Sequence, residues 1–131
     1  MALSKTVSGA EMESGFADHP GHTLTVEPAA SRITVRAGDE LLIDTNDALV
    51  LREGEYAPAY YFPRSAIDMN RLNRTDHTTW CPFKGCAAYY SIGDDPALAN
   101  AVWTYEDPFE EVGAIKDRIA FYADKVVIDV V

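Results

Sequence analysis

The sequence predicts a single mainly β domain, a compact β-meander with one or two short helices. Apolar and polar residues alternate with a period of two over many short segments, which is typical of half-buried strands. Gly, Pro, Asn and Asp separate these segments, and β-branched and aromatic residues dominate the last ones. The chain has 131 residues, which suits one domain with its own core.

Two parts of the chain differ in pattern. Residues 1–21 lack sustained periodicity and are rich in Ser and Gly, so we expect an N-terminal arm that is flexible unless it docks on the domain. The alternation begins at His22, and we expect the β domain to occupy residues 22–131.

The first half of the domain predicts four strands. Leu24 and Val26 alternate with polar residues, and Ile33 and Val35 do the same. Turn residues at Gly38-Asp39 and Asn46-Asp47 interrupt the pattern, so the second, third and fourth strands should form a continuous meander. The expected ranges are 22–27, 32–36, 41–45 and 48–53.

The second half mixes strands with less regular segments. Strands are expected at 59–62, 87–92, 100–105, 119–122 and 126–131. Residues 64–69 suit a short strand or one helical turn, and residues 72–85 suggest a long loop with at most a short strand. Asp107 and Pro108 indicate the start of a short helix that runs to about Asp117.

Charge and cysteine content limit the function. The net charge is −10, with 21 acidic against 11 basic residues, which argues against binding to nucleic acid or to an anionic membrane surface. No apolar run is long enough to span a bilayer, and no signal peptide is visible. We therefore expect a cytoplasmic protein in which Cys81 and Cys86 are reduced. We expect no cofactor, since no phosphate-binding glycine loop is present.

Four blocks of unusual residues carry a family resemblance. They are Tyr60–Arg64, Thr75–Gly85, Ala101–Tyr105 and Ile119–Tyr122. In content, order and spacing they resemble the hallmark segments of the family known as domain of unknown function 427, from about His22 to Asp129. The resemblance implies a compact β-rich domain, akin in topology to the Mss4-like (β-tent-like) group, and it implies no particular activity.

The Mss4-like group raises the question of zinc. Such sites usually need paired Cys-x-x-Cys motifs, whereas this chain has one Cys-x-x-x-x-Cys and no second pair. His19 and His22 have a spacing that suits chelation, but with His77 they do not complete a ligand shell. We therefore expect no metal site.

One segment suggests nucleophilic catalysis. If residues 76–85 are extended, His77, Thr79 and Cys81 point to one face and Asp76 to the other. His77 would then act as base for a Cys81 nucleophile, with Lys84 stabilising charge. The alternative is a loop whose Asp and Thr side chains bond to its own backbone, with Cys81 as a small buried apolar residue.

The preferred hypothesis is a small-ligand binding or sensing domain, with a pocket around the Asp76–Gly85 loop. Arg64, His77 and Lys84 would suit an anionic metabolite in an otherwise acidic chain. Aromatic walls would come from Tyr60, Tyr61, Trp80, Tyr89, Tyr90, Trp103 and Tyr105. The candidate ligand-binding residues are Tyr61, Arg64, Asp76, His77, Thr79, Lys84, Tyr90 and Trp103.

Two plainer alternatives remain at this point. In one, the aromatic residues fill a β core and Arg64 pairs with a local carboxylate. In the other, the chain is a structural or interaction module, a monomer or a homodimer in which exposed aromatic residues form the dimer face. The acidic stretch from Asp94 to Glu111 is expected to be a solvated surface.

Overall fold

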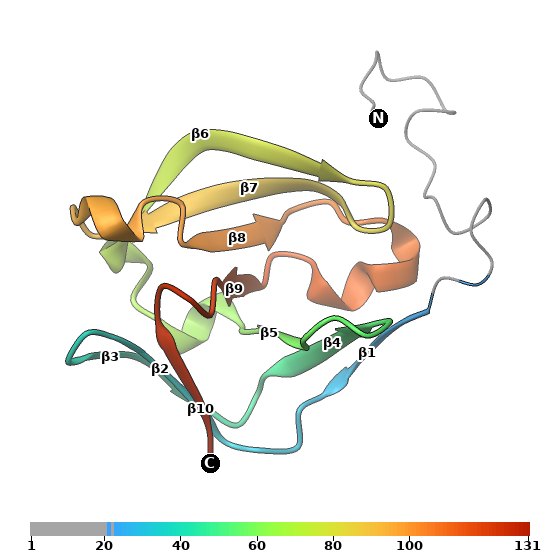
Figure 1. The fold of residues 1–131 in the computed structure, drawn as a ribbon, viewed down its shortest axis with the longest axis horizontal. Helices are drawn as coiled ribbons and strands as arrows, with labels where there is room; N and C mark the ends of the chain where they lie inside the picture. Colours follow the sequence, from blue (N-terminus) through green and yellow to red (C-terminus); the bar gives the residue numbers. More distant parts are fainter. Residues whose placement is uncertain (1–20, 22) are drawn as a thin grey trace.

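The computed structural model describes Gly21 and residues 23–131. The N-terminal arm expected at 1–21 lies outside the described residues apart from Gly21. The expected mainly β fold is confirmed, because the described residues form ten strands in three antiparallel sheets, joined by short 3-10 turns (Figure 1). In this part of the chain no helix has the length and apolar character needed to cross a membrane.

Two of the sheets have three strands each. One has the order β1-β4-β5, formed by Leu24–Pro28, Leu49–Glu53 and Ala59–Tyr61. The other has the order β10-β2-β3, formed by Val127–Val130, Ile33–Ala37 and Glu40–Thr45. The two sheets lie below the four-stranded sheet in Figure 1.

The prediction of a continuous meander over residues 32–53 is wrong for its last strand. Strand β4 pairs with β1 and β5 instead of β3. The Thr45 hydroxyl accepts the N–H of Asp47 at 3.1 Å, and this turn leads the chain out of the β3 sheet. Val50 and Leu51, adjacent in β4, are both buried, so β4 is covered on both faces.

The third sheet is a four-stranded meander of β6 (Leu72–Cys81), β7 (Gly85–Ile92), β8 (Val102–Tyr105) and β9 (Ile119–Phe121). The prediction of a long loop at 72–85 is therefore wrong for its first ten residues, which form the edge strand β6. Most β6 side chains are exposed, and Thr75, Asp76 and His77 bulge opposite Tyr89, so the sequence lacks the usual alternation.

The helical segments are 3-10 turns at Arg64–Ala66 (η1), Met69–Arg71 (η2), Pro96–Leu98 (η3) and Glu110–Ile115 (η4). The single turn considered for 64–69 is confirmed by η1. The helix expected from Asp107 begins later, after Phe109, and has a kink at Val112. Asp107 does not cap it, and η4 ends two residues after Gly113, a poor helix former.

The four-stranded sheet has a core cluster on each face. Tyr90 and Val102 pack with β2 and β3 residues, whereas Tyr89, Trp103 and Tyr105 pack with β4 and β5 residues. We call these the opposite face and the tyrosine face. A bridge joins Phe62, the residue after β5, to Ile119 of β9, with N–H to carbonyl distances of 2.8 and 2.9 Å. The tyrosine face is therefore held directly against the β1-β4-β5 sheet.

Candidate functional site

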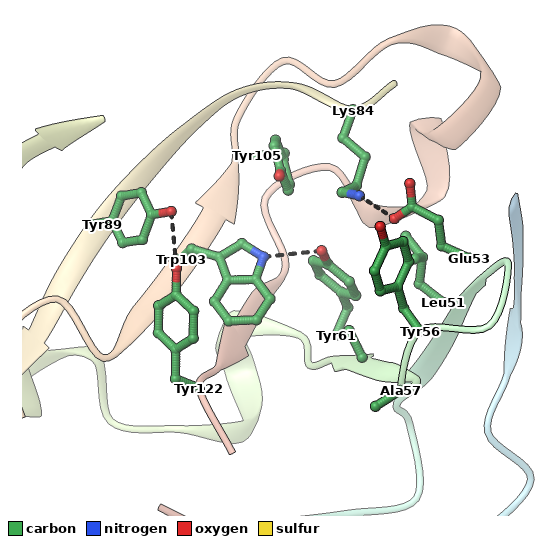
Figure 2. Close-up of a pocket in the computed structure, with 11 residues that line it drawn as sticks. Leu51, Glu53, Tyr56, Ala57, Tyr61, Lys84, Tyr89, Trp103, Tyr105 and Tyr122 are labelled. Carbon is green, nitrogen blue, oxygen red and sulfur yellow. Dashed lines mark hydrogen bonds and ion pairs between the residues drawn. The ribbon is translucent and has the colours of Figure 1, made fainter. Parts of the chain in front are cut away.

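A pocket of about 210 Å³ lies between the tyrosine face and the β4 and β5 strands. We call it the tyrosine pocket (Figure 2). Its aromatic lining consists of five tyrosines and one tryptophan: Tyr56, Tyr61, Tyr89, Trp103, Tyr105 and Tyr122. The other lining residues are Leu51, Glu53, Ala57, Ala59 and Lys84.

Strand alternation explains why these side chains meet. Trp103 and Tyr105 are two residues apart in β8, and Tyr89 of β7 lies directly opposite Trp103. Leu51 and Glu53 alternate in the same way on β4, and Tyr61 extends from the neighbouring β5. The pocket is thus built mainly by regular strands, which hold side chains more firmly than loops do.

Hydrogen bonds fix the aromatic rings in place. The indole N–H of Trp103 donates to the hydroxyl oxygen of Tyr61 at 3.0 Å, and the two rings meet edge to face. The Tyr89 hydroxyl bonds to Thr79 at 2.9 Å and to Tyr122 at 3.3 Å. The Trp103 and Tyr122 rings are 4.7 Å apart between centroids. These contacts leave the walls preorganised (Figure 2).

A shielded ion pair forms one side of the pocket. The Lys84 ammonium lies 2.7 Å from a Glu53 carboxylate oxygen, and the side chains are only 13% and 16% exposed. Lys84 belongs to the β6–β7 turn, where its N–H donates to the Cys81 carbonyl at 3.3 Å. The next residue, Gly85, has a φ of +109°, and a Cβ there would lie 3.4 Å from the Asp107 carbonyl oxygen. Glycine therefore suits the close approach that positions Lys84.

The phenols of the pocket are held in their neutral form. Burial raises the pKa of Tyr61 and of Tyr105 well above the ordinary value. Burial, and then a hydrogen bond with Tyr89, raises the pKa of Tyr122 to about 12. All three hydroxyls therefore keep their protons at neutral pH.

The structure brings five of the expected ligand-binding residues to this region. Tyr61, Lys84 and Trp103 line the pocket. His77 and Thr79 support its Tyr89 wall from β6, since the His77 ring centroid lies 4.5 Å from that of Tyr89 and Thr79 bonds to its hydroxyl.

Arg64 and Tyr90 lie on the opposite face. The Arg64 guanidinium donates to the Asp117 carbonyl at 2.7 Å and to the buried Thr104 hydroxyl at 3.2 Å, and it lies 5.9 Å from the Tyr90 ring centroid. Tyr90 follows Tyr89 in β7, so its side chain points the other way. Asp76 is exposed in the β6 bulge. These three residues do not line the tyrosine pocket.

The three residues expected to be catalytic lie near the pocket, but within the described residues their side chains are not hydrogen-bonded to one another. Burial is the main cause that raises the pKa of Tyr61 and of Tyr105, and Cys81 adds to it, which places Cys81 within electrostatic range of both phenols. His77 lies four residues away, about 13 Å in an extended strand. Within the described residues, no hydrogen bond links the His77 imidazole to Cys81 or to Lys84. Nucleophilic catalysis by Cys81 stays a prediction.

The described residues contain no group of three or more His, Cys, Asp or Glu arranged to hold a metal. The spacing noted for His19 and His22 lies outside those residues.

Sequence reasoning missed several pocket residues. Tyr89 and Tyr105 were expected as aromatic walls but not as ligand-binding residues, and alternation from Trp103 gives the signal for Tyr105. Tyr56 lies in the β4–β5 loop and Tyr122 follows β9, so neither belongs to a pattern that points to the pocket. Trp80 was expected as an aromatic wall, but it lies beside a different hollow, where its ring centroid is 5.6 Å from that of Phe109.

Together, the fold and the site define a small mainly β domain with an aromatic pocket between two sheets. The family described as a domain of unknown function, DUF427, matches residues 25–131, and the chain belongs to this family. The resemblance noted from the sequence blocks is thereby confirmed. Comparison with curated proteins gave no match.

Proposed function

We propose that this domain binds a small organic molecule in the tyrosine pocket. The observation that carries the proposal is the gathering of six aromatic side chains around one hollow, together with a shielded ion pair. Ligand sites are typically apolar concavities with a few well-placed polar groups. The volume of about 210 Å³ lies below the range of drug-sized ligands, so the ligand is a smaller compound.

The lining favours a planar and uncharged ligand. Flat rings such as those of Trp103 and Tyr61 offer faces and edges for stacking against another ring. An anionic metabolite was expected because Arg64 and Lys84 were taken together. Arg64 lies on the opposite face, and Glu53 already neutralises Lys84, so an anion gains little at this pocket.

A thermal-shift panel tests the proposal. Small planar compounds should be compared with non-planar ones on the full chain. A ligand at ten times its Kd stabilises the fold by about 1.4 kcal/mol, which raises the Tm by roughly 5 °C.

Two variants show whether a stabilising compound occupies the pocket. Tyr56 lines it but is 77% exposed, so Tyr56→Ala should fold normally and bind more weakly. Leu41→Ala, at an exposed position in β3 that does not line the pocket, serves as the control. The proposal fails if no compound raises the Tm, or if Tyr56→Ala responds as strongly as Leu41→Ala.

The proposal also includes a location for the protein. Cys81 and Cys86 both carry free thiols, which supports the cytoplasm as the location.

A further inference from the structure

The Tyr105 side chain is buried, and among the described residues its hydroxyl has no hydrogen-bond partner. Tyr105 is only 5% exposed, yet no residue that the structure describes forms a hydrogen bond with its hydroxyl. Buried hydroxyls nearly always have a partner in the protein, in ordered water or in a ligand. The Tyr105 hydroxyl therefore marks a position where a bound molecule can supply the missing acceptor.

The surroundings of this hydroxyl place it at the tyrosine pocket. Burial is the largest cause that raises the pKa of Tyr105. Smaller contributions come, in decreasing order, from Tyr61, Cys81, Tyr89 and Glu53, and all of these residues except Cys81 line the pocket. Figure 2 shows Tyr105 between Trp103 and Lys84 along the edge of the hollow.

The Tyr61 hydroxyl is a second hydrogen-bond donor in the same pocket. The Tyr61 hydroxyl oxygen accepts the Trp103 indole N–H, but within the described part of the chain its own proton has no acceptor. Tyr61 is 1% exposed and lines the same pocket as Tyr105 (Figure 2). Two buried O–H donors thus lie near one another at one pocket and lack acceptors among those residues.

We propose that the hydroxyls of Tyr61 and Tyr105 together bind the carbonyl oxygen of an uncharged planar molecule, such as an aromatic amide. This inference rests on the proposed function and names the ligand class for that pocket. A carbonyl oxygen has two lone pairs and accepts two hydrogen bonds, which matches the two available donors. The aromatic walls would hold the ring to which the carbonyl is attached.

Charge favours a carbonyl over a carboxylate at this position. Burial is the main cause that raises the pKa of Tyr61 and of Tyr105, and the negative charge of Glu53 adds to it, so this charge acts unfavourably on any anion placed at their hydroxyls. The nearby Lys84 is already paired with Glu53 at 2.7 Å. A neutral acceptor uses the two O–H donors without adding a second negative charge.

Three probes on one ring separate these contributions. Benzamide carries a neutral carbonyl, benzoate carries a carboxylate, and toluene carries neither. Their Kd values should be measured on the full chain by amide and indole NMR shifts, in the wild type and in Tyr105→Phe. Tyr60→Phe is the matched control, since it removes the hydroxyl of a tyrosine that does not line the pocket.

We expect Tyr105→Phe to weaken benzamide binding about tenfold and to leave toluene binding unchanged. Tyr60→Phe should change neither, and benzoate should bind more weakly than benzamide. Because the Tyr105 hydroxyl lacks a partner among the described residues, Tyr105→Phe should fold as stably as the wild type.

The outcomes distinguish the two proposals. If benzamide binds at the pocket with equal affinity in wild type and Tyr105→Phe, the donor pair is refuted and the pocket keeps its proposed function. Tighter binding of benzoate than of benzamide refutes the choice of a neutral carbonyl. If none of the probes, and no compound of the wider panel, binds at the pocket, both proposals are refuted.

Discussion

The indole N–H of Trp103 donates to the hydroxyl oxygen of Tyr61 at 3.0 Å, and this bond joins the two sheets that enclose the tyrosine pocket. Trp103 belongs to β8 and Tyr61 to β5, and their rings meet edge to face with centroids 6.2 Å apart. The contact fixes one wall of the pocket and a part of the core at the same time. Stability and ligand binding should therefore depend on the same residues.

Tyr61→Phe tests this link. The change keeps the ring but leaves the Trp103 indole N–H without its acceptor, which should lower the free energy of unfolding by about 1–2 kcal/mol. Chemical denaturation measures the loss, and Tyr60→Phe provides a neighbouring control, since the Tyr60 hydroxyl forms no hydrogen bond with any residue that the structure describes. Equal stability of the two variants would show that the Trp103–Tyr61 bond contributes nothing to folding.

Lys84→Met tests the shielded ion pair. Because Glu53 would keep its charge in a site where it is only 16% exposed, we expect a loss of about 2–3 kcal/mol. Arg32→Met breaks the Arg32–Asp44 pair, whose side chains are 53% and 36% exposed, and should stay near the wild type. Denaturation midpoints of the two variants decide the matter. Similar losses would contradict a special role for shielding at Lys84.

Alkaline titration tests the neutral phenols. Burial raises the folded-state pKa of Tyr61, Tyr105 and Tyr122 above the ordinary value near 10, to about 12 for Tyr122. The unfolded chain loses these protons first, so the stability they contribute is complete below about pH 10 and declines as the pH rises through about 12.

Tyrosinate absorbance at 295 nm, followed with circular dichroism, measures this effect. We expect these three phenols to ionise only above pH 11 or during unfolding, so the absorbance change should be incomplete while the fold persists. Complete ionisation of all seven tyrosines near pH 10 with the fold intact would contradict the burial of the pocket phenols.

Gly85→Ala tests the turn that positions Lys84. The φ of +109° disfavours any side chain, and the new Cβ would lie 3.4 Å from the Asp107 carbonyl oxygen, so we expect a loss of about 2–3 kcal/mol. Gly54→Ala also has a positive φ, +53°, but its Cβ would meet nothing within 4 Å, and it should lose only about 1 kcal/mol. An unfolding free energy for Gly85→Ala equal to that of Gly54→Ala would remove the argument from close approach.

Regular alternation explains what the sequence could predict. The strands β2, β3 and β7 to β10 were expected within a few residues, because apolar, β-branched or aromatic residues recur along each of them. Trp103 and Tyr61 were selected as pocket residues from the same patterns. Strand β6 was not predicted, because it lies at a sheet edge, carries polar residues on both of its faces and has a bulge at Thr75–His77.

The rest of the site depends on contacts between distant segments. Choosing Tyr89 over Tyr90 requires knowing which face of β7 meets β4 and β5, and both residues are equally aromatic. Arg64 was selected from the sequence because it is a cation, but its hydrogen bonds to Asp117 and Thr104 hold it on the opposite face. Glu53 lies 31 residues before Lys84 in the sequence, so no local pattern relates the two.

The two indole N–H signals in an NMR titration test the central claim most directly. Trp103 lines the tyrosine pocket, whereas Trp80 lies beside a separate hollow, and Trp80→Phe assigns the two signals. If a small planar ligand occupies the pocket, the Trp103 signal should shift in a saturable manner while the Trp80 signal stays in place. A saturable shift confined to Trp80, or no shift of Trp103 with any ligand that stabilises the fold, would contradict the account.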